Sequence, residues 1–311
     1  MSSVLAARPA FLPPLAGLGE LAGAQVALTG QRGVLGSLLA DRLAAGGAEV
    51  CGYPGDVGDA AALAAWLAPL RARHVFNLAA LVPVERVEAD PLGAYQTNVI
   101  GTFNVCRAVI LRRRPAWLFQ CSTSHVYAPG SAGAPLAESA PTAPATWYGT
   151  TKLAAERVAA ELLGKAGIPV CTGRVFSYTH ARQRPPYLVP SLRERIAALP
   201  EGGTLEVRNP SAVRDILDAA HVVDAILLLA MAGADGIVNI GSGTGRSVRE
   251  LALAVAAEGG RHVGVAGRDV ETGGLVADTT RLRSLLARAS AAGASAAGAS
   301  AAGDGTPERA P

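Results

Sequence analysis

Aromatic residues, charged residues and long hydrophobic runs are all scarce in this chain of 311 residues. Only 5% of the residues are aromatic and 17% are charged, and the net charge is only +3, so we expect no nucleic-acid partner. No apolar run reaches the ~18 to 20 residues that span a bilayer, so we expect no membrane span. The amino-terminal segment lacks a basic stretch and is broken by prolines, which argues against a signal peptide and favours a cytoplasmic location.

Cysteine is also rare, and its four positions lie far apart. They form no CxxC pair and have no histidine at metal-ligand spacing, so we predict no metal site. Buried structural thiols are the favoured interpretation of Cys51, Cys106, Cys121 and Cys171.

Half of the residues are apolar, which is enough for one large domain or two unequal lobes. From residue 24, short β-rich runs alternate with longer helical patterns. This rhythm is typical of successive βαβ units, and it predicts an α/β fold with a doubly wound parallel sheet of the Rossmann type. The predicted strands are Gln25–Thr29, Glu49–Gly52, His74–Leu78, Trp117–Ser122 and Val170–Val175, and the predicted helices are Val34–Ala45, Ala60–Leu67, Pro91–Ile110 and Tyr148–Gly164.

The chain divides into four parts. Residues 1–23 form an N-terminal extension, and 24–176 form the Rossmann-type domain. Residues 177–288 change rhythm, with helices near Ser191–Ala198 and Ala219–Ala232; we expect a smaller lobe there, mainly substrate-binding, from which the chain returns to the first domain. Residues 289–311 contain three ASAAG repeats with no large apolar side chain, which predicts a disordered tail.

A glycine-rich turn, TGQRGVLG, follows the first predicted strand and opens the first predicted helix. Gly30 permits a tight turn, Gly33 lets the backbone approach a pyrophosphate, and Gly36 allows close packing of helix and strand. The helix N-terminus offers free N–H groups to the phosphates, so this turn predicts a dinucleotide site. The expected cofactor contacts in the turn are Thr29, Gly30, Gln31, Arg32, Gly33, Val34 and Gly36.

The second predicted strand does not end in the acid that usually binds the adenosine ribose of NAD, because Pro54 stands there. Arg32, inside the glycine turn, could instead bind a 2′-phosphate, since a guanidinium matches phosphate geometry. NADP(H) is therefore favoured over NAD(H), which stays open. Asp56 and Val57 are expected against the edge of the adenine.

Tyr148 and Lys152 lie four residues apart on one predicted helix and therefore on one face of it. A phenol with a pKa near ~10 transfers protons poorly at neutral pH, and a fixed ammonium beside it would lower that value. Lys152 could also hydrogen-bond the nicotinamide ribose. At the carboxyl end of another strand, one hydroxyl of the run Ser122, Thr123 and Ser124 should hydrogen-bond the substrate oxygen.

Seven ordered motifs resemble those of the extended short-chain dehydrogenase/reductases, the NAD-dependent epimerase/dehydratase family that modifies nucleotide sugars. They are TGQRGVLG, FNLAA, NVIGTFNV, CSTSHVY, YGTTK, VRDILDAAHVVDA and VNIGSG, and they cover about residues 24–285. The resemblance implies Tyr148 as the catalytic acid/base, Lys152 as its partner and Thr123 as the catalytic hydroxyl. It also implies cofactor contacts at Leu78, Ala79, Ala80 and Asn98, and substrate contacts at Ser124, Ser177, Arg214 and Arg268.

Within the family, the motifs look most like those of reductases of nucleotide-linked 4-keto-6-deoxyhexoses, which implies NADPH-dependent reduction. The 4,6-dehydratases carry an Asp-Glu pair where Ser124 and His125 stand here, so we do not expect elimination. Two alternatives stay open: an NAD-dependent 4-epimerase with the same residues, and a regulatory protein that binds NADP(H) without turnover. The expected partners are a nucleotide sugar and a second copy of the chain in a homodimer.

Overall fold

The computed structural model describes residues 7–288 except 16, 129, 132–133 and 270–272, so the tail predicted at 289–311 lies outside the described residues. Its centre is a six-stranded sheet, all parallel, with the strand order β11-β7-β4-β3-β1-β2. This confirms the predicted α/β fold with a Rossmann-type sheet. The strands are β1 (Gln25–Thr29), β2 (Glu49–Gly52), β3 (His74–Asn77), β4 (Trp117–Thr123), β7 (Val170–Val175) and β11 (Gly236–Ile240).

The order of these strands reverses once along the chain. From β1 the chain moves out to β2 at one edge, then returns past β1 to add β3, β4, β7 and β11 on the other side. The reversal therefore lies between β1 and β3. In open parallel sheets, a ligand-binding crevice forms at the carboxyl ends of the two strands that flank such a reversal.

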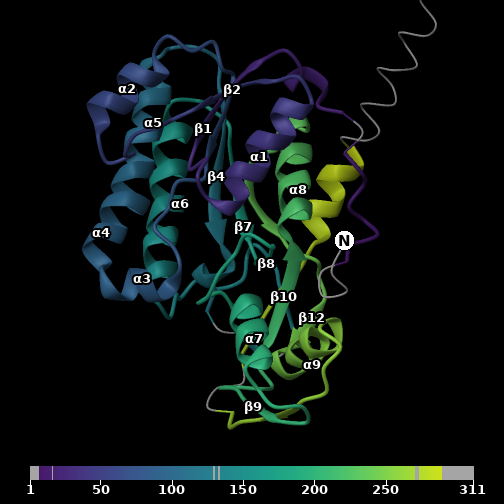
Figure 1. Ribbon diagram of the computed structural model, residues 1–311. Coiled ribbons are helices and arrows are strands. Elements are labelled where there is room, and N and C mark those ends of the chain that lie inside the picture. Colours follow the sequence, from purple (N-terminus) through teal and green to yellow (C-terminus); the bar gives the residue numbers. More distant parts are fainter. Residues whose placement is uncertain (1–6, 16, 129, 132–133, 270–272, 289–311) are drawn as a thin grey trace, which may run out of the picture.

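Helices cover both faces of the sheet (Figure 1). α1 (Val34–Ala45) and α8 (Ala219–Met231) pack together on one face, and α2 (Ala60–Leu67), α5 (Gly101–Leu111) and α6 (Trp147–Lys165) form the layer on the other. Strands enclosed on both faces need apolar side chains on both, and every residue of β3 is buried. None of the helices in the described part of the chain has the length and apolarity that crossing a membrane requires.

The helix predicted over 91–110 is divided into three parts. α4 (Pro91–Tyr95) leads through a π-helical turn, η3 (Gln96–Ile100), into α5. A π-helical turn departs from the 3.6-residue period on which the prediction relied, so the apolar pattern could not show it. The turn buries Asn98 completely, between the segment after β3 and helix α6.

A smaller lobe lies below the sheet in Figure 1; most of it comes from the chain after β7, and β5 and β6 join it from the segment between β4 and α6. A mixed sheet, ordered β12-β10-β14-β5 with β6 and β8 at its sides, and a separate β9–β13 pair form this lobe together with α7 and α9. Through α8 and β11 the chain joins the first sheet again. The bounds are α7 (Leu188–Ala197), α9 (Val248–Glu258), β5 (Gly130–Ser131), β6 (Pro135–Leu136), β8 (Ser177–Thr179), β9 (Thr204–Glu206), β10 (Val213–Asp218), β12 (Gly245–Ser247), β13 (Gly264–Ala266) and β14 (Gly273–Ala277).

The described part of the segment before β1 packs against the face formed by α1 and α8. Leu18 is buried in the same apolar cluster as these helices, and Arg8 pairs with the buried carboxylate of Asp224 on α8 at 2.8 Å. The last described helical run, 280–288, adds Leu286 to that cluster. Both ends of the described chain therefore close the side of the sheet opposite α6 (Figure 1).

Candidate active site

The glycine-rich turn closes tightly against β3. Gly30 follows β1 with a φ of +78°, and a side chain on it would collide with the backbone of Leu78. Gly36 approaches the Gly30 carbonyl so closely that an added Cβ would be 2.1 Å from the oxygen. Gly33 precedes α1, and no described side chain caps this helix. The N–H groups of its first turn are therefore open to a ligand, and their partial positive charge favours phosphate.

A cavity of about 690 Å³ opens beside this turn. Its walls come from the segments that follow β1, β2 and β3, so it lies at the reversal of the strand order. An uncapped helix N-terminus and the ammonium of Lys152 in one cavity suit the phosphates and ribose of a dinucleotide. The cavity brings together most of the predicted cofactor contacts: Gly30, Gln31, Arg32, Gly33, Val34, Gly36, Asp56, Val57, Leu78, Ala79, Ala80, Tyr148 and Lys152.

Two predicted cofactor contacts, Thr29 and Asn98, are not among the described residues that line this cavity. Thr29 Oγ1 donates to Asn77 Oδ1 at 2.6 Å. Asn98 accepts from the N–H of Leu81 at 2.7 Å and donates to Thr151 Oγ1 at 3.0 Å. Both side chains therefore stabilise the cavity wall through hydrogen bonds within the protein and do not face the cavity themselves.

The end of β2 is covered by the glycine turn itself. The side chain of Gln31 lies across Gly52, the last residue of β2, where an added Cβ would overlap Gln31 Oε1. Arg32 is exposed and lines the same cavity. Tyr53 also lines it, together with Pro54. Tyr53 was not among the predicted cofactor contacts, although its position directly after a strand of the sheet is a usable signal.

Helix α6 starts where Thr146 caps it by accepting a hydrogen bond from the N–H of Gly149 at 3.1 Å. Gly149 lets the helix approach the end of β4 closely, because a Cβ there would be 2.2 Å from the carbonyl oxygen of His125. One helical turn then places Tyr148 and Lys152 on the same side of α6. Both line the cofactor cavity, and Lys152 is only 2% exposed.

The ionisation of Tyr148 differs from the expectation. Burial raises the pKa of the phenol above its ordinary value, as would a thiolate at Cys121, while a hydrogen bond with Thr123 opposes the rise. Burial lowers the pKa of Lys152, against the charges of Cys121 and Glu156. Desolvation therefore raises the pKa of Tyr148, although the ammonium of Lys152 was expected to lower it. The phenol is protonated at neutral pH, which is the state that can donate a proton.

A second cavity, of about 530 Å³, adjoins the first and shares Tyr148 with it. It lies between the carboxyl end of β4 and the smaller lobe. Arg268, a predicted substrate contact, is exposed and is not among the described residues that line this cavity. The other predicted residues of this side all line it: Thr123, Ser124, Ser177 and Arg214.

Ser122, another candidate hydroxyl of the strand-end run, is engaged within the protein. Its Oγ donates to the carboxylate of Glu156 on α6. The run CSTSH could not show which hydroxyl faces outward, because side chains alternate along a strand while the turn after it breaks the alternation.

Further side chains line the cavities beyond those expected. His125 lines the second cavity, and burial together with the charge of Arg214 lowers its pKa to about 4. The sequence analysis treated His125 only as a departure from the dehydratases. Two tyrosines of the stretch after β7, which carries no motif, line both cavities: Tyr178 of β8 and Tyr187 just before α7.

Several curated proteins are similar to this chain, and three of them show the range of reactions. A dTDP-6-deoxy-L-talose 4-dehydrogenase (NAD(P)(+)) from Kitasatospora kifunensis is 29% identical over 255 residues, covering 77% of this chain and 80% of the relative. A dTDP-4-dehydrorhamnose reductase from Streptomyces griseus is 37% identical over 155 residues, covering 48% and 49%. A UDP-glucose 4-epimerase from Rhizobium leguminosarum bv. trifolii is 28% identical over 253 residues, covering 75% and 77%.

The structure of RMD from Pseudomonas aeruginosa complexed with NADPH is also similar, with a TM-score of 0.75 and 25% identity over 85% of this chain and 92% of that chain. A family model described as the NAD dependent epimerase/dehydratase family matches residues 26–241. This range holds the glycine turn and both Tyr148 and Lys152. The chain therefore belongs to the NAD-dependent epimerase/dehydratase family, the extended short-chain dehydrogenase/reductases.

Proposed function

We propose that this protein reduces the 4-keto group of a nucleotide-activated 6-deoxyhexose with NADPH. The observation that carries the proposal is the position of Tyr148, whose side chain lies in the walls of both cavities. A carbonyl reduction needs its proton donor at such a boundary between the cofactor and the substrate. The similarity to a 4-dehydrogenase and to a 4-dehydrorhamnose reductase supports a reaction at the 4-position.

Each catalytic side chain has one task in this reaction. NADPH, when bound, supplies hydride to the C4 carbon. Tyr148, which burial keeps protonated, donates its proton to the oxygen as alkoxide character develops there. Thr123 hydrogen-bonds the phenol and stabilises the phenolate that remains. Lys152 adds positive charge beside that phenolate, and it would hydrogen-bond a ribose hydroxyl of the bound cofactor.

Arg214 is assigned to the diphosphate of the substrate. Its guanidinium enters the second cavity from β10, and its fork of N–H groups can bind a phosphate bidentately. The hydroxyls of Ser124 and Ser177 line the same cavity and are assigned to the sugar. Arg268 stays a proposed second phosphate contact, on its resemblance alone, since it is not among the described residues that line this cavity.

The assignment of NADPH depends on the end of β2. Gln31 covers Gly52, at the end of the strand where an acid would bind the ribose of NAD. The exposed guanidinium of Arg32 lines the same cavity, and no acid at the end of β2 would repel a 2′-phosphate there. These two features favour a 2′-phosphate.

The test begins with the purified protein. Its absorbance spectrum shows whether a dinucleotide is retained, and a panel of nucleotide-linked 4-keto-6-deoxyhexoses is then tested for NADPH consumption. We expect an exchangeable cofactor and stoichiometric loss of NADPH with one member of the panel. Binding of NADPH with no consumption across the panel would instead support the regulatory alternative.

A 4-epimerase is the second candidate, because the match to a UDP-glucose 4-epimerase covers 75% of this chain. Such an enzyme oxidises and re-reduces the same carbon with a cofactor that it keeps. Retained NAD, interconversion of two epimers and no net change in absorbance at the nicotinamide band would favour this reaction over reduction.

We also propose a homodimer. Large apolar side chains are exposed along the α4–η3–α5 segment and at the start of α6, and α5 packs against α6. Exposed apolar side chains on neighbouring helices are typical of contact sites between protein chains. These residues are Leu92, Tyr95, Ile100, Phe103, Leu111 and Trp147.

A further inference from the structure

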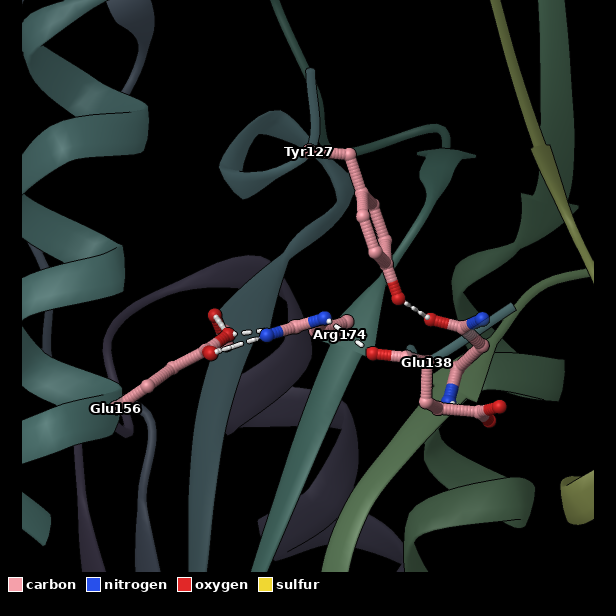
Figure 2. A network of polar contacts seen from close by, with 6 residues as sticks. Tyr127, Glu138, Glu156 and Arg174 are labelled. Atoms are coloured by element: carbon pink, nitrogen blue, oxygen red, sulfur yellow. Dashed lines mark hydrogen bonds and ion pairs between the residues drawn. The ribbon is translucent and has the colours of Figure 1, made fainter. Parts of the chain in front are cut away.

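A buried ion pair joins the catalytic helix to the sheet (Figure 2). Glu156 of α6 and Arg174 of β7 lie 2.7 Å apart, with 6% and 3% of their side chains exposed. Arg174 Nε also donates to Glu156 at 3.0 Å, and Ser122 Oγ of β4 donates to the same carboxylate. Glu156 thus receives donors from two strands whose carboxyl ends form the active site.

Arg174 is held from its other side as well (Figure 2). Its Nη1 donates to the backbone oxygen of Glu138 at 3.1 Å, and its guanidinium lies 4.7 Å from the ring centre of Tyr127. Tyr127 donates to Asn239 Oδ1 of β11 at 2.6 Å, and the Glu138 side chain accepts from the N–H of Asn239 at 2.9 Å. The carboxylate of Glu156 is therefore anchored in a network that extends across β4, β7 and β11.

Glu156 comes one helical turn after Lys152 and shares the buried side of α6 with it. The charged form of Lys152 is disfavoured by burial and favoured by Cys121 on β4 and by Glu156. Cys121 is a neutral thiol near pH 7, because burial raises its pKa above 9.0. The phenols that line the same cavity are neutral too, since burial raises the pKa of each: Tyr148, Tyr178 and Tyr187.

We propose that Glu156 is a positioning residue of this active site: clamped by Ser122 and Arg174, its carboxylate keeps Lys152 charged and holds α6 against β4 and β7. The inference rests on the catalytic role proposed above for Lys152. A buried ion pair stabilises a fold no better than a well-packed apolar pair, so stability alone does not account for it. Because Ser122 directly precedes Thr123, the same carboxylate also fixes the strand end that carries the catalytic hydroxyl.

The titration of Lys152 can be measured directly. The chain contains two lysines, Lys152 and Lys165, so ¹³C-labelled lysine gives two side-chain Cε signals by NMR, with Lys165 as the internal reference. Glu156→Gln is expected to shift the titration of Lys152 to lower pH. Glu161→Gln is the matched control: it removes an exposed carboxylate on the same helix that pairs with Lys165 at 2.7 Å, so its direct effect should appear in the Lys165 signal, which serves as the reference only in the wild type and in Glu156→Gln. The control should leave the Lys152 titration as in the wild type.

Glu156→Gln leaves Arg174 buried without its counter-ion and can unfold the protein. The double variant Glu156→Gln/Arg174→Met removes both charges and keeps the volume. We expect it to fold and still to titrate Lys152 at lower pH than the wild type, because Glu156, and not Arg174, is among the charges that act on Lys152. A wild-type Lys152 titration in the folded single or double variant would overturn the proposal.

The titration needs no substrate, so its result is separate from that of the proposed reaction. Absence of reductase activity in a protein that shows the Lys152 shift would refute the function and leave the electrostatic role of Glu156 standing. With an active substrate, we expect kcat of Glu156→Gln to fall about tenfold with little change in KM. The pH above which kcat declines should also be lower in Glu156→Gln than in the wild type. Glu161→Gln should behave as the wild type.

Discussion

The imidazole of His125 lies edge-on to the phenol of Tyr148, with ring centres 5.7 Å apart and ring planes at 68°. Burial and the charge of Arg214 lower the pKa of His125 to about 4. The imidazole is therefore neutral at physiological pH, and it adds no positive charge beside the proposed proton donor. His125 lines the second cavity, where its imidazole can accept a hydrogen bond from a substrate hydroxyl or donate one to it.

The same shift predicts how stability depends on pH. In the unfolded chain the pKa of His125 returns to about 6.5, so the unfolded state binds more protons between about pH 4 and pH 6.5. The contribution of His125 to stability is complete above that range and is lost as pH falls through it. We expect the melting temperature of His125→Gln to fall less steeply with acid than that of the wild type. If the melting temperatures of both proteins fall equally with pH across this range, the buried environment assigned to His125 is wrong.

Tyr148→Phe keeps the ring and removes the proton that the reaction uses. Turnover should fall by about 10² to 10⁴-fold, while NADPH affinity, measured by nicotinamide fluorescence, should change little. Tyr95→Phe, at an exposed tyrosine of α4 outside both cavities, is the control; it keeps the apolar ring of the proposed dimer contact and should retain full activity. An active Tyr148→Phe enzyme would remove Tyr148 from the mechanism.

Arg32→Ala tests the preference for a 2′-phosphate. The dissociation constant of NADPH should rise by about tenfold or more, because a charge-assisted contact with phosphate is lost, while that of NADH should stay nearly constant. Arg107→Ala, at an exposed position of α5, controls for the general loss of positive charge. Equal weakening of both cofactors would show that Arg32 does not read the 2′-position.

Gly36→Ala would push a methyl group against the Gly30 carbonyl oxygen. We expect a loss of about 1 to 3 kcal/mol in the free energy of unfolding, together with weaker dinucleotide binding, because the turn cannot close. Gly164→Ala in α6 meets no atom within 4 Å and should instead stabilise by about 0.5 to 1 kcal/mol, since alanine favours helix. Chemical denaturation measures both changes, and a neutral Gly36→Ala would mean that the turn can relax.

Phe103→Asp places a charge within the exposed apolar residues of α5. If these residues form the proposed dimer contact, the variant should elute as a monomer at concentrations where the wild type is a dimer, as measured by light scattering. Leu253→Asp, at an exposed leucine of α9, should leave the mass unchanged. A wild-type protein that is already monomeric would exclude this assembly.

Local features determined much of the fold and of the cofactor site. The predicted bounds of β1, α1, β2, α2 and β7 coincide with the observed ones, because a strand or helix is set by an apolar period within one short segment. The glycine turn is equally local: its backbone needs Gly30 and Gly36 whatever lies farther along the chain. Four-residue spacing likewise placed Tyr148 and Lys152 on one side of α6.

Tertiary structure decided what depends on residues far apart in the chain. Packing of α6 against β4 and β7 turned Ser122 toward Glu156 and left Thr123 facing the second cavity, which no reading of CSTSH could establish. The desolvation that keeps Tyr148 protonated also arises only when distant segments enclose it. Sequence periodicity reports the environment of a side chain on average, whereas the charge and partner of a buried group are set by which other groups the fold brings to it.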